Sequence, residues 1–267
     1  MVEVIVTGAA GRMGGRLVAL LKGSASMRLA GAVERKGHGS IGEDAGEIAG
    51  CGRMGVTIGN DFSSVIGQGD VTIDFSSPGA ALEHLRIAVQ HRRPLVMGTT
   101  GLSAQDLIEL RALAGQIPCV FSPNMSIGVN VVFKVIEEMA KTFGDDYDIE
   151  VIEAHHRLKK DAPSGTALKL AEVLASAVNR DLGQVGVYAR NGLIGERKRG
   201  EIGIQTVRAG DIVGDHTVLF GTMGERLEVT HRASSRDTFA RGALRAAQWI
   251  VKQPPGLYDM LDVLSLR

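Results

Sequence analysis

Apolar and polar positions in the first half of the chain follow two alternating periods. Short β-rich apolar runs predict strands at Val2–Val6, Arg28–Glu34, Val71–Phe75, Pro94–Met97 and Cys119–Phe121. Between these runs, apolar residues recur three or four positions apart, as at Leu82, Leu85 and Val89, which predicts helices. Strands separated by helices of this length imply right-handed crossovers. We therefore expect an α/β fold with a parallel sheet.

The pattern changes after Phe121. Helices are predicted through Val131, Val135 and Met139, over Ser164–Val178, and near Ser235–Val251. Strands are predicted at Asp148–Ala154, Ile202–Val207, Ile212–Phe220 and Arg226–Thr230. We interpret the last three as consecutive strands of an antiparallel meander within a smaller α+β domain. After the final helix we expect only a short tail beyond Pro254 and Pro255.

A glycine-rich turn, Thr7-Gly8-Ala9-Ala10-Gly11-Arg12-Met13-Gly14, follows the first predicted strand. Glycines between a strand and a helix let the backbone approach a pyrophosphate at the positive end of the helix. The spacing departs from the strict dinucleotide fingerprint at Ala10, so the turn alone would fit a plain strand-to-helix connection almost as well. Glu34, at the end of the second strand, supplies the acid that accepts hydrogen bonds from an adenosine ribose. The combination predicts a Rossmann-like dinucleotide-binding domain.

Arg35 and Lys36 directly follow Glu34. An NAD site keeps an acidic residue here, whereas the 2′-phosphate of NADP favours arginine. Both types side by side predict that NADH and NADPH are both accepted. The alternative is an ordinary solvated charge cluster.

A second concentration of reactive side chains lies at 153–166. His155 and His156 lie at the end of a predicted strand, and Lys159 follows four residues after His155. Histidine suits proton donation near neutral pH, and lysine supplies a fixed cation. Ser164 then opens a helix whose N-terminal N–H groups can bind an anion. The segment predicts a site for a small carboxylate-bearing substrate that needs a general acid; a polar loop with structural histidines is the alternative.

Composition narrows the classes of function. Thirty basic residues balance thirty acidic ones, so no charge pattern for nucleic acid or an anionic membrane is visible. No apolar run reaches the roughly 18 residues of a membrane-spanning helix, and the N-terminus lacks a signal-peptide pattern. Cys51 and Cys119 have no metal or redox spacing, and adjacent histidines cannot easily ligate one ion. We expect a reduced cytoplasmic enzyme without a metal.

The run EAHHRLKKDAPSGTA, together with GAAGRMG near the N-terminus, resembles the dihydrodipicolinate reductase family. The resemblance extends through VERKG, VMGTTGL, FSPNMSIGVNV and TVRAGDIVGDHTVLF to the closing GLYDMLDVL, over essentially the whole chain. It implies NADH- or NADPH-dependent reduction of 4-hydroxy-tetrahydrodipicolinate, a cyclic imine dicarboxylate, to tetrahydrodipicolinate in diaminopimelate and lysine biosynthesis. It also implies a homotetramer with a dinucleotide-binding domain at 1–126, a substrate-binding and tetramerisation domain at 127–234, and a C-terminal helix and tail at 235–267 that return to the first domain.

The resemblance also assigns residue roles. His155 is the expected proton donor, and Lys159 a second donor or charge stabiliser. Expected substrate contacts are His156, Ser164, Gly165, Thr166 and Thr100. Expected cofactor contacts are Gly8, Ala9, Ala10, Gly11, Arg12, Met13, Glu34, Arg35, Gly98, Thr99, Thr100, Ser122, Pro123, Asn124 and Met125. Other members carry glycine where Ala10 stands, or a basic residue where Ser77 stands.

Two other functions fit part of the pattern. A different Rossmann reductase, such as an aspartate-semialdehyde dehydrogenase, would need a reactive thiol, and neither cysteine has an obvious base beside it. A non-catalytic redox sensor could keep the glycine turn. It would have no reason to keep His155, Lys159 and Ser164 in one segment.

Overall fold

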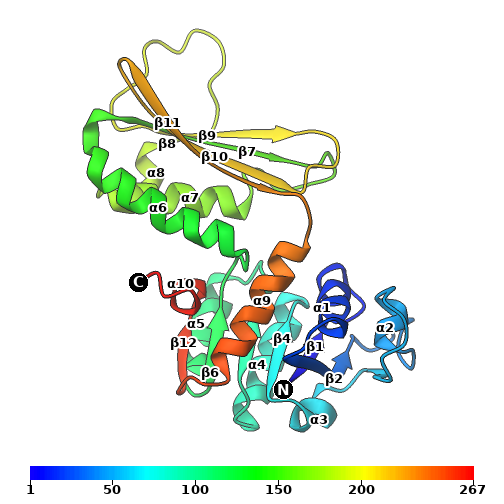
Figure 1. Ribbon diagram of the computed structural model, residues 1–267. Helices are drawn as coiled ribbons and strands as arrows, with labels where there is room; N and C mark the ends of the chain where they lie inside the picture. Colours follow the sequence, from blue (N-terminus) through cyan, green and yellow to red (C-terminus); the bar gives the residue numbers. More distant parts are fainter. The chain divides into compact units, whose positions relative to one another are not determined.

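The computed structural model describes all 267 residues, which divide into two compact units (Figure 1). Unit 1 consists of Met1–Ile127 and Arg236–Arg267, and unit 2 of Gly128–Ser235. None of the helices combines the length and apolar character needed to cross a lipid bilayer.

Unit 1 is built on a seven-stranded parallel sheet with the order β12-β6-β5-β4-β1-β2-β3. Its strands are β1 (Val2–Thr7), β2 (Met27–Val33), β3 (Ile58–Gly59), β4 (Val71–Asp74), β5 (Leu95–Met97), β6 (Pro118–Phe121) and β12 (Gly256–Tyr258). From β1 the chain first builds one side of the sheet and then returns to build the other. This order confirms the predicted Rossmann-like arrangement, with its topological switch point between β1 and β4.

Helices accompany the strands of unit 1. They are α1 (Arg12–Lys22), α2 (Ala45–Ile48), α3 (Phe62–Val65), the 3-10 helix η1 (Ile66–Gln68), α4 (Pro78–Gln90), α5 (Ala104–Ala114), α9 (Asp237–Ile250) and α10 (Met260–Val263). Helix α5 begins at a reciprocal capping box between Ser103 and Asp106, and α4 has Pro78 in its first turn. Both starts therefore rest on residues next to them in the chain.

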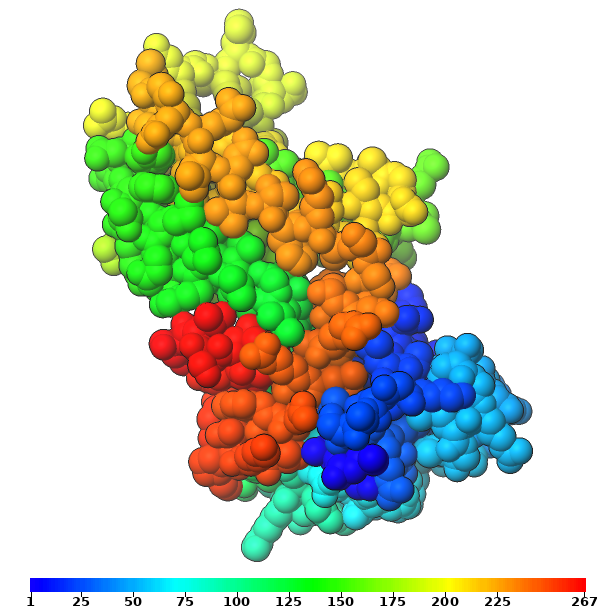
Figure 2. All heavy atoms as spheres, in the orientation of Figure 1, coloured from blue at the N-terminus to red at the C-terminus, as the bar shows by residue number.

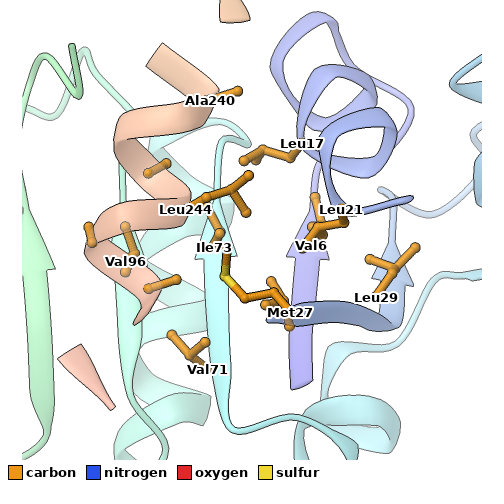
Figure 3. Packing of buried hydrophobic residues seen from close by; sticks show 14 of the residues in the cluster. Val6, Leu17, Leu21, Met27, Leu29, Val71, Ile73, Val96, Ala240 and Leu244 are labelled. Carbon is orange, nitrogen blue, oxygen red and sulfur yellow. The ribbon is translucent and has the colours of Figure 1, made fainter. Parts of the chain in front are cut away.

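Helix α9 belongs to the core of unit 1 although it comes late in the chain. Ala240 and Leu244 lie in one apolar cluster with Leu17 of α1 and Ile73 of β4 (Figure 3). Burying a leucine-sized side chain contributes about 1.5–3 kcal/mol, so this helix stabilises the unit substantially. A Cβ on Gly242 would lie 1.7 Å from the carbonyl oxygen of Met125, which shows how closely α9 approaches the backbone.

The segment after Pro255 is not the plain tail that the sequence suggested. Gly256–Tyr258 form β12, which pairs in parallel with Pro118–Val120 of β6 and extends the sheet by one strand. A run of three residues that begins with glycine and follows two prolines is too short to show the alternation that predicts a strand. Its pairing depends on the exposed edge that β6 offers.

Unit 2 contains a five-stranded mixed sheet in the order β11-β10-β7-β9-β8. Its elements are α6 (Ile127–Phe143), the 3-10 helix η2 (Gly144–Asp146), β7 (Asp148–His155), α7 (Gly165–Ala177), α8 (Leu182–Val185), β8 (Gly186–Val187), β9 (Ile202–Arg208), β10 (Gly214–Thr222) and β11 (Glu225–Ala233). Helices α6 and α7 cover one face of this sheet (Figure 1).

The predicted meander is wrong for β9. Strands β10 and β11 do form an antiparallel hairpin, but β7 lies between β9 and β10, and β9 runs parallel to β7. Apolar periodicity finds strands without specifying their partners. The helices between β7 and β9 provide the long crossover that a parallel pair requires.

A long loop, residues 188–201, projects from unit 2 between β8 and β9 (Figures 1 and 2). Arg190 and Arg197 from this loop both form ion pairs with Glu150 of β7, and Arg197 also pairs with Asp148. Arg197 therefore attaches that loop to the sheet.

Candidate active site

Close backbone contacts shape the glycine turn after β1. Gly8 has a φ of +69°, and a Cβ there would lie 2.5 Å from the carbonyl oxygen of Phe75. A Cβ on Gly14 would lie 2.1 Å from the carbonyl oxygen of Gly8. Gly11 is the N-cap of α1 and places no side chain over the helix end. Larger residues at these positions would push the turn and the helix apart, so the glycines keep the N-terminus of α1 open.

A cavity of about 870 Å³ lies beside this turn, at the carboxyl ends of β1, β2 and β4. Open α/β sheets bind ligands at this position, and the volume is in the usual range for a ligand site. Of the predicted cofactor residues, Gly8, Gly11, Glu34 and Arg35 line it. Lys36, considered with Arg35 from the sequence, lines it as well. The other lining residues were not predicted: Val33, Asn60, Asp61, Phe62, Ser63, Phe75, Ser76, Ser77, Ala80, Glu83, His84 and Ile87.

Glu34 lies directly after β2 and close to the glycine turn. Its carboxylate accepts hydrogen bonds from the N–H groups of Ala10, at 3.2 Å, and Arg35, at 3.0 Å. The neighbouring Ala9 N–H donates to the carbonyl oxygen of Val33. Arg35 and Lys36 line the cavity and form no ion pair within the chain, so both cations are available to an anionic ligand.

Of the remaining predicted cofactor residues, Ala9 and Ala10 lie in the glycine turn, and the others follow other strand ends of the same sheet or begin α1. Arg12 and Met13 form the first turn of α1, Gly98, Thr99 and Thr100 follow β5, and Ser122, Pro123, Asn124 and Met125 follow β6. Thr99 and Ser122 are buried and are bonded to the protein, while Thr100 is exposed. None of this set lines the cavity beside Glu34.

A buried carboxylate at the end of β4 ties these strand ends together. Asp74 accepts hydrogen bonds from the hydroxyls of Thr7 and Thr99, both at 2.6 Å, and lies 2.6 Å from Nδ1 of His84. Burial alone would raise the pKa of Asp74, but the hydrogen bonds from His84 and the threonines lower it. Asp74 is therefore an ionised hub at the switch point, a role that its place at a strand end could have suggested.

In unit 2, strand alternation places a second group of polar residues on the helix-covered face. Glu153 and His155 are two residues apart on β7 and point to the same side as the apolar Val151. The register sets Thr206 beside Glu153, Arg208 beside His155, and His216 opposite Glu153. Only His155 had been assigned a role from the sequence. The sequence signal for the others was their two-residue spacing, as in Glu153 and His155 or Thr206 and Arg208, which places both side chains of a pair on one face of a strand.

Glu153 is completely buried and is bound on all sides. Arg208 donates to both carboxylate oxygens at 2.8 Å, and His155 Nδ1 lies 2.6 Å from Oε2. Burial raises the pKa of Glu153, but hydrogen bonds from Arg208 and His155 outweigh it and hold the value at about 2. Burial is also the largest influence on His155 and lowers its pKa.

Helix α7 brings the predicted anion site to this group. Ser164 is its N-cap: the hydroxyl accepts from Ala167 N–H and lies 3.2 Å from His216 Nε2, and the Ser164 N–H donates to Glu153. The Ser164 side chain is therefore already engaged within the protein. Gly165 begins the helix and has open space above it, since no atom lies within 4 Å of an ideal Cβ.

The other predicted site residues lie in the loop between β7 and α7. Lys159 forms an ion pair with Asp161 at 2.9 Å, and its side chain is only 21% exposed. His156 directly follows the end of β7, and its Nδ1 is buried without a hydrogen-bond partner. The structure therefore places His155, His156, Lys159, Ser164 and Gly165 around one end of the sheet, beside the N-terminus of a helix.

Acid should destabilise this protein through His216 before it protonates Glu153. Burial, followed by the neighbouring charge of His155, lowers the pKa of His216 to about 4. The fold favours the neutral form of His216. Its contribution to the free energy of unfolding is therefore complete above pH 6.5. This contribution is lost as the pH falls toward 4, by as much as about 3 kcal/mol. Glu153 contributes to the free energy of unfolding above pH 4.5, and this contribution is lost as the pH falls toward 2.

Thermal melts at several pH values test this expectation. The melting temperature should fall between pH 6.5 and pH 5, and the fall should be smaller in a His216→Asn variant. Replacing the exposed His91 with asparagine is the control and should leave the slope unchanged. Equal slopes for the wild type and His216→Asn would contradict the assignment.

The cysteines do not fit a thiol-dependent reaction. Burial raises the pKa of the Cys119 thiol to about 12, so this thiol is protonated at neutral pH. Cys51 makes weak thiol contacts to backbone carbonyls and to Met54 in a loop of unit 1, and the Lys22 amine there donates to its carbonyl oxygen; no histidine or carboxylate bonds the thiol. The semialdehyde-dehydrogenase alternative therefore lacks its nucleophile.

Comparison with known proteins covers both units. The family models described as "Dihydrodipicolinate reductase, N-terminus" and "Dihydrodipicolinate reductase, C-terminus" match residues 2–125 and 128–264. The chain is 57% identical to a 4-hydroxy-tetrahydrodipicolinate reductase of Syntrophus aciditrophicus and 54% identical to one of Syntrophobacter fumaroxidans, each over 100% of both chains. It also resembles a solved dipicolinate-bound dihydrodipicolinate reductase from Paenisporosarcina sp. TG-14, with a TM-score of 0.73, 25% identity and coverage of 98% of both chains.

Proposed function

The chain belongs to the dihydrodipicolinate reductase family, and from this premise we propose that it reduces 4-hydroxy-tetrahydrodipicolinate with NADH or NADPH, using His155 as the proton donor. The observation that carries the proton-donor assignment is the buried Glu153–His155 pair beside the N-terminus of α7. A histidine held in this way can deliver a proton to a substrate whose carboxylate binds the helix end.

The residues of unit 1 fit a nicotinamide dinucleotide. The glycine turn has no room for side chains at Gly8 and Gly14, and it leaves the N-terminus of α1 open for a pyrophosphate. Glu34 is placed for the hydroxyls of a ribose, and the cavity beside it is large enough for an adenosine. When bound, the nicotinamide supplies a hydride to the substrate ring.

The residues of unit 2 fit the other half of the reaction. Loss of the 4-hydroxyl as water leaves a conjugated, electron-poor ring, and negative charge develops on its enamine side during reduction. His155 is the group that neutralises this charge by proton transfer. Lys159 stabilises the charge as it forms, and His156 contacts the substrate.

Carboxylates of the substrate are bound by fixed positive charges and by N–H donors. We assign one carboxylate to the backbone N–H groups of Gly165 and Thr166 in the first turn of α7, where the helix dipole favours an anion. Ser164 holds this helix end in place through its hydrogen bonds to Glu153 and Ala167. Thr100, in unit 1, is assigned to the substrate as well.

A coupled assay tests the function directly. Purified protein, NADPH and freshly generated imine substrate should give a loss of absorbance at 340 nm that depends on the substrate. Tetrahydrodipicolinate should appear in equal amount by mass spectrometry. Consumption of NADPH without this product would reject the proposed substrate, and cofactor binding without any turnover would favour a sensor.

Arg35 should separate the two cofactors. Its side chain lines the cavity directly after Glu34 and has no ion pair of its own, so it can bind the 2′-phosphate of NADPH. Arg35→Ala should raise the Kd for NADPH roughly 10-fold or more, as expected for a lost charged hydrogen bond, and change that for NADH little. Fluorescence titration of each cofactor measures both constants. Equal losses for the two cofactors would show that Arg35 does not select the phosphate.

We also propose that the protein is a cytoplasmic homotetramer. No helix covers the outer face of the unit 2 sheet, which carries the apolar side chains of Ile152 and Val207 at 37% and 44% exposure. Burying such a face between copies would remove this apolar area from water. Sedimentation equilibrium should give the mass of four chains, and the monomer mass would reject the assembly.

The cytoplasmic location is supported by the cysteines: two cysteines without a disulfide are compatible with a reducing compartment.

A further inference from the structure

The buried carboxylate of Glu153 has four hydrogen-bond partners within unit 2. Besides the two bonds from Arg208 and the contact with His155, its Oε1 accepts from Ser164 N–H at 3.0 Å and from the Thr206 hydroxyl at 3.3 Å. Arg208 and the Ser164 N–H can only donate, and between them they donate to both carboxylate oxygens. A buried carboxylate in this setting is ionised, so His155 must also donate to it through Nδ1–H.

This bond determines which nitrogen of His155 can carry the transferred proton. With Nδ1–H held by Glu153, neutral His155 has its lone pair on Nε2, and protonated His155 carries its second proton there. Gly214 lies beside this nitrogen, because a Cβ at that position would be 3.0 Å from His155 Nε2. The glycine leaves Nε2 unobstructed on that side.

The surroundings of His155 restrict its ring as well. His216 packs edge-to-face against it, with the ring centroids 5.2 Å apart. The other charged groups that act on His155 are Lys159 and Arg208, both of which disfavour the imidazolium, and Glu153, which favours it. Glu153 is therefore the one carboxylate that stabilises the protonated ring.

We propose that Glu153 is a positioning residue that fixes His155 as the Nδ1–H tautomer and, through Ser164 N–H, sets the N-terminus of α7 relative to it. One carboxylate then aligns the proton donor with the backbone that receives the substrate carboxylate. This proposal rests on the proposed function only for the consequence in catalysis, because the tautomer is a property of the protein without ligands.

The first test is the tautomer itself. Protein labelled with ¹⁵N-histidine contains seven histidines, and the His155 signals are identified by their loss in His155→Gln. At a pH above the titration of His155, Nδ1 should show the shift of a protonated nitrogen and Nε2 that of a bare one. The opposite pattern in the wild-type protein would overturn the proposal whether or not any variant folds.

The second test is the Glu153→Gln variant, in which an amide can donate to Nδ1 and favour the other tautomer. We expect kcat to fall roughly 10²–10⁴-fold with a smaller change in KM, and the Nδ1–H signal to be lost. Glu153→Asp keeps the charge and should restore part of kcat and of the wild-type pH profile.

The matched control is Glu150→Gln. Glu150 lies on the same strand and is also bound by two arginines, but it points to the opposite face. This variant should lose stability and keep the wild-type tautomer and pH profile. If folded Glu153→Gln behaves like Glu150→Gln, the positioning role is wrong. If His155→Gln retains full turnover while the wild-type tautomer is as expected, the proposed proton donor is wrong instead.

Discussion

Replacing His155 with glutamine should lower kcat for the imine substrate by about 10²–10⁴-fold, the usual contribution of a general acid. Glutamine keeps the size and polarity of the side chain but cannot transfer a proton. Binding of NADPH should be unchanged, because the cavity and the glycine turn are built from other residues. Steady-state kinetics and a fluorescence titration of the cofactor measure the two effects. His91→Gln, at an exposed position, is the control and should behave like the wild type.

The pH dependence of the wild-type enzyme gives an independent check. The general acid must be protonated, and burial lowers the pKa of free His155 from its ordinary 6.5. The value of kcat/KM should therefore decrease as pH rises, with a midpoint below 6.5. The profile of kcat should extend to higher pH, since a bound dicarboxylate favours the imidazolium. A kcat/KM that rises through this range would exclude protonated His155 as the donor.

The second large effect is expected from Gly14→Ala. The new Cβ would meet the carbonyl oxygen of Gly8 at 2.1 Å and the Cα of Ala9 at 2.7 Å, and both are backbone atoms. The helix must move away from the turn, which costs about 1–3 kcal/mol or more and displaces the N–H groups that we propose face the pyrophosphate. We expect a lower melting temperature and at least roughly 10-fold weaker binding of both NADH and NADPH.

Gly15→Ala is the matched control for this prediction. Gly15 is the next residue in the same helix, and its Cβ would have only one neighbour, at 4.0 Å. Alanine also favours a helix by as much as about 1 kcal/mol relative to glycine. The Gly15→Ala variant should therefore be at least as stable as the wild type. If both variants bind the cofactor normally, the close packing of α1 on the turn is not what the cofactor site depends on.

Much of unit 1 could be predicted from the sequence because its signals are local. The strand-helix alternation, the glycine turn and the capping box at Ser103 depend on residues close together in the chain. The dinucleotide site follows from a rule about strand ends and needs no knowledge of distant contacts.

The sequence did not predict which strands pair when they lie far apart in the chain. Neither the insertion of β7 between β9 and β10 nor the addition of β12 to the sheet edge has a local pattern. The cavity residues around Phe62 and His84 were missed for the same reason, since they come from segments that only the fold brings together.

The candidate site residues of unit 2 divide in the same way into those found from the sequence and those that were missed. His155, Lys159 and Ser164 lie in one segment and were found from it, whereas Arg208 and His216 come from strands far along the chain. Glu153 is the instructive case. It lies in the recognised segment, two residues before His155, yet only the observed burial and the two bonds from Arg208 reveal why it is there.

The position of α9 in the core of unit 1 has a consequence for how the protein is made. Unit 2 is one uninterrupted stretch of chain, whereas the core of unit 1 needs Ala243, Leu244 and Ile250 from the far side of that stretch. During synthesis, unit 2 can therefore complete its fold while the sheet of unit 1 still exposes apolar surface. The strands that are synthesised first therefore belong to the unit that completes its fold last. The nascent chain has most need of a chaperone between these two events, because apolar surface of unit 1 is then exposed.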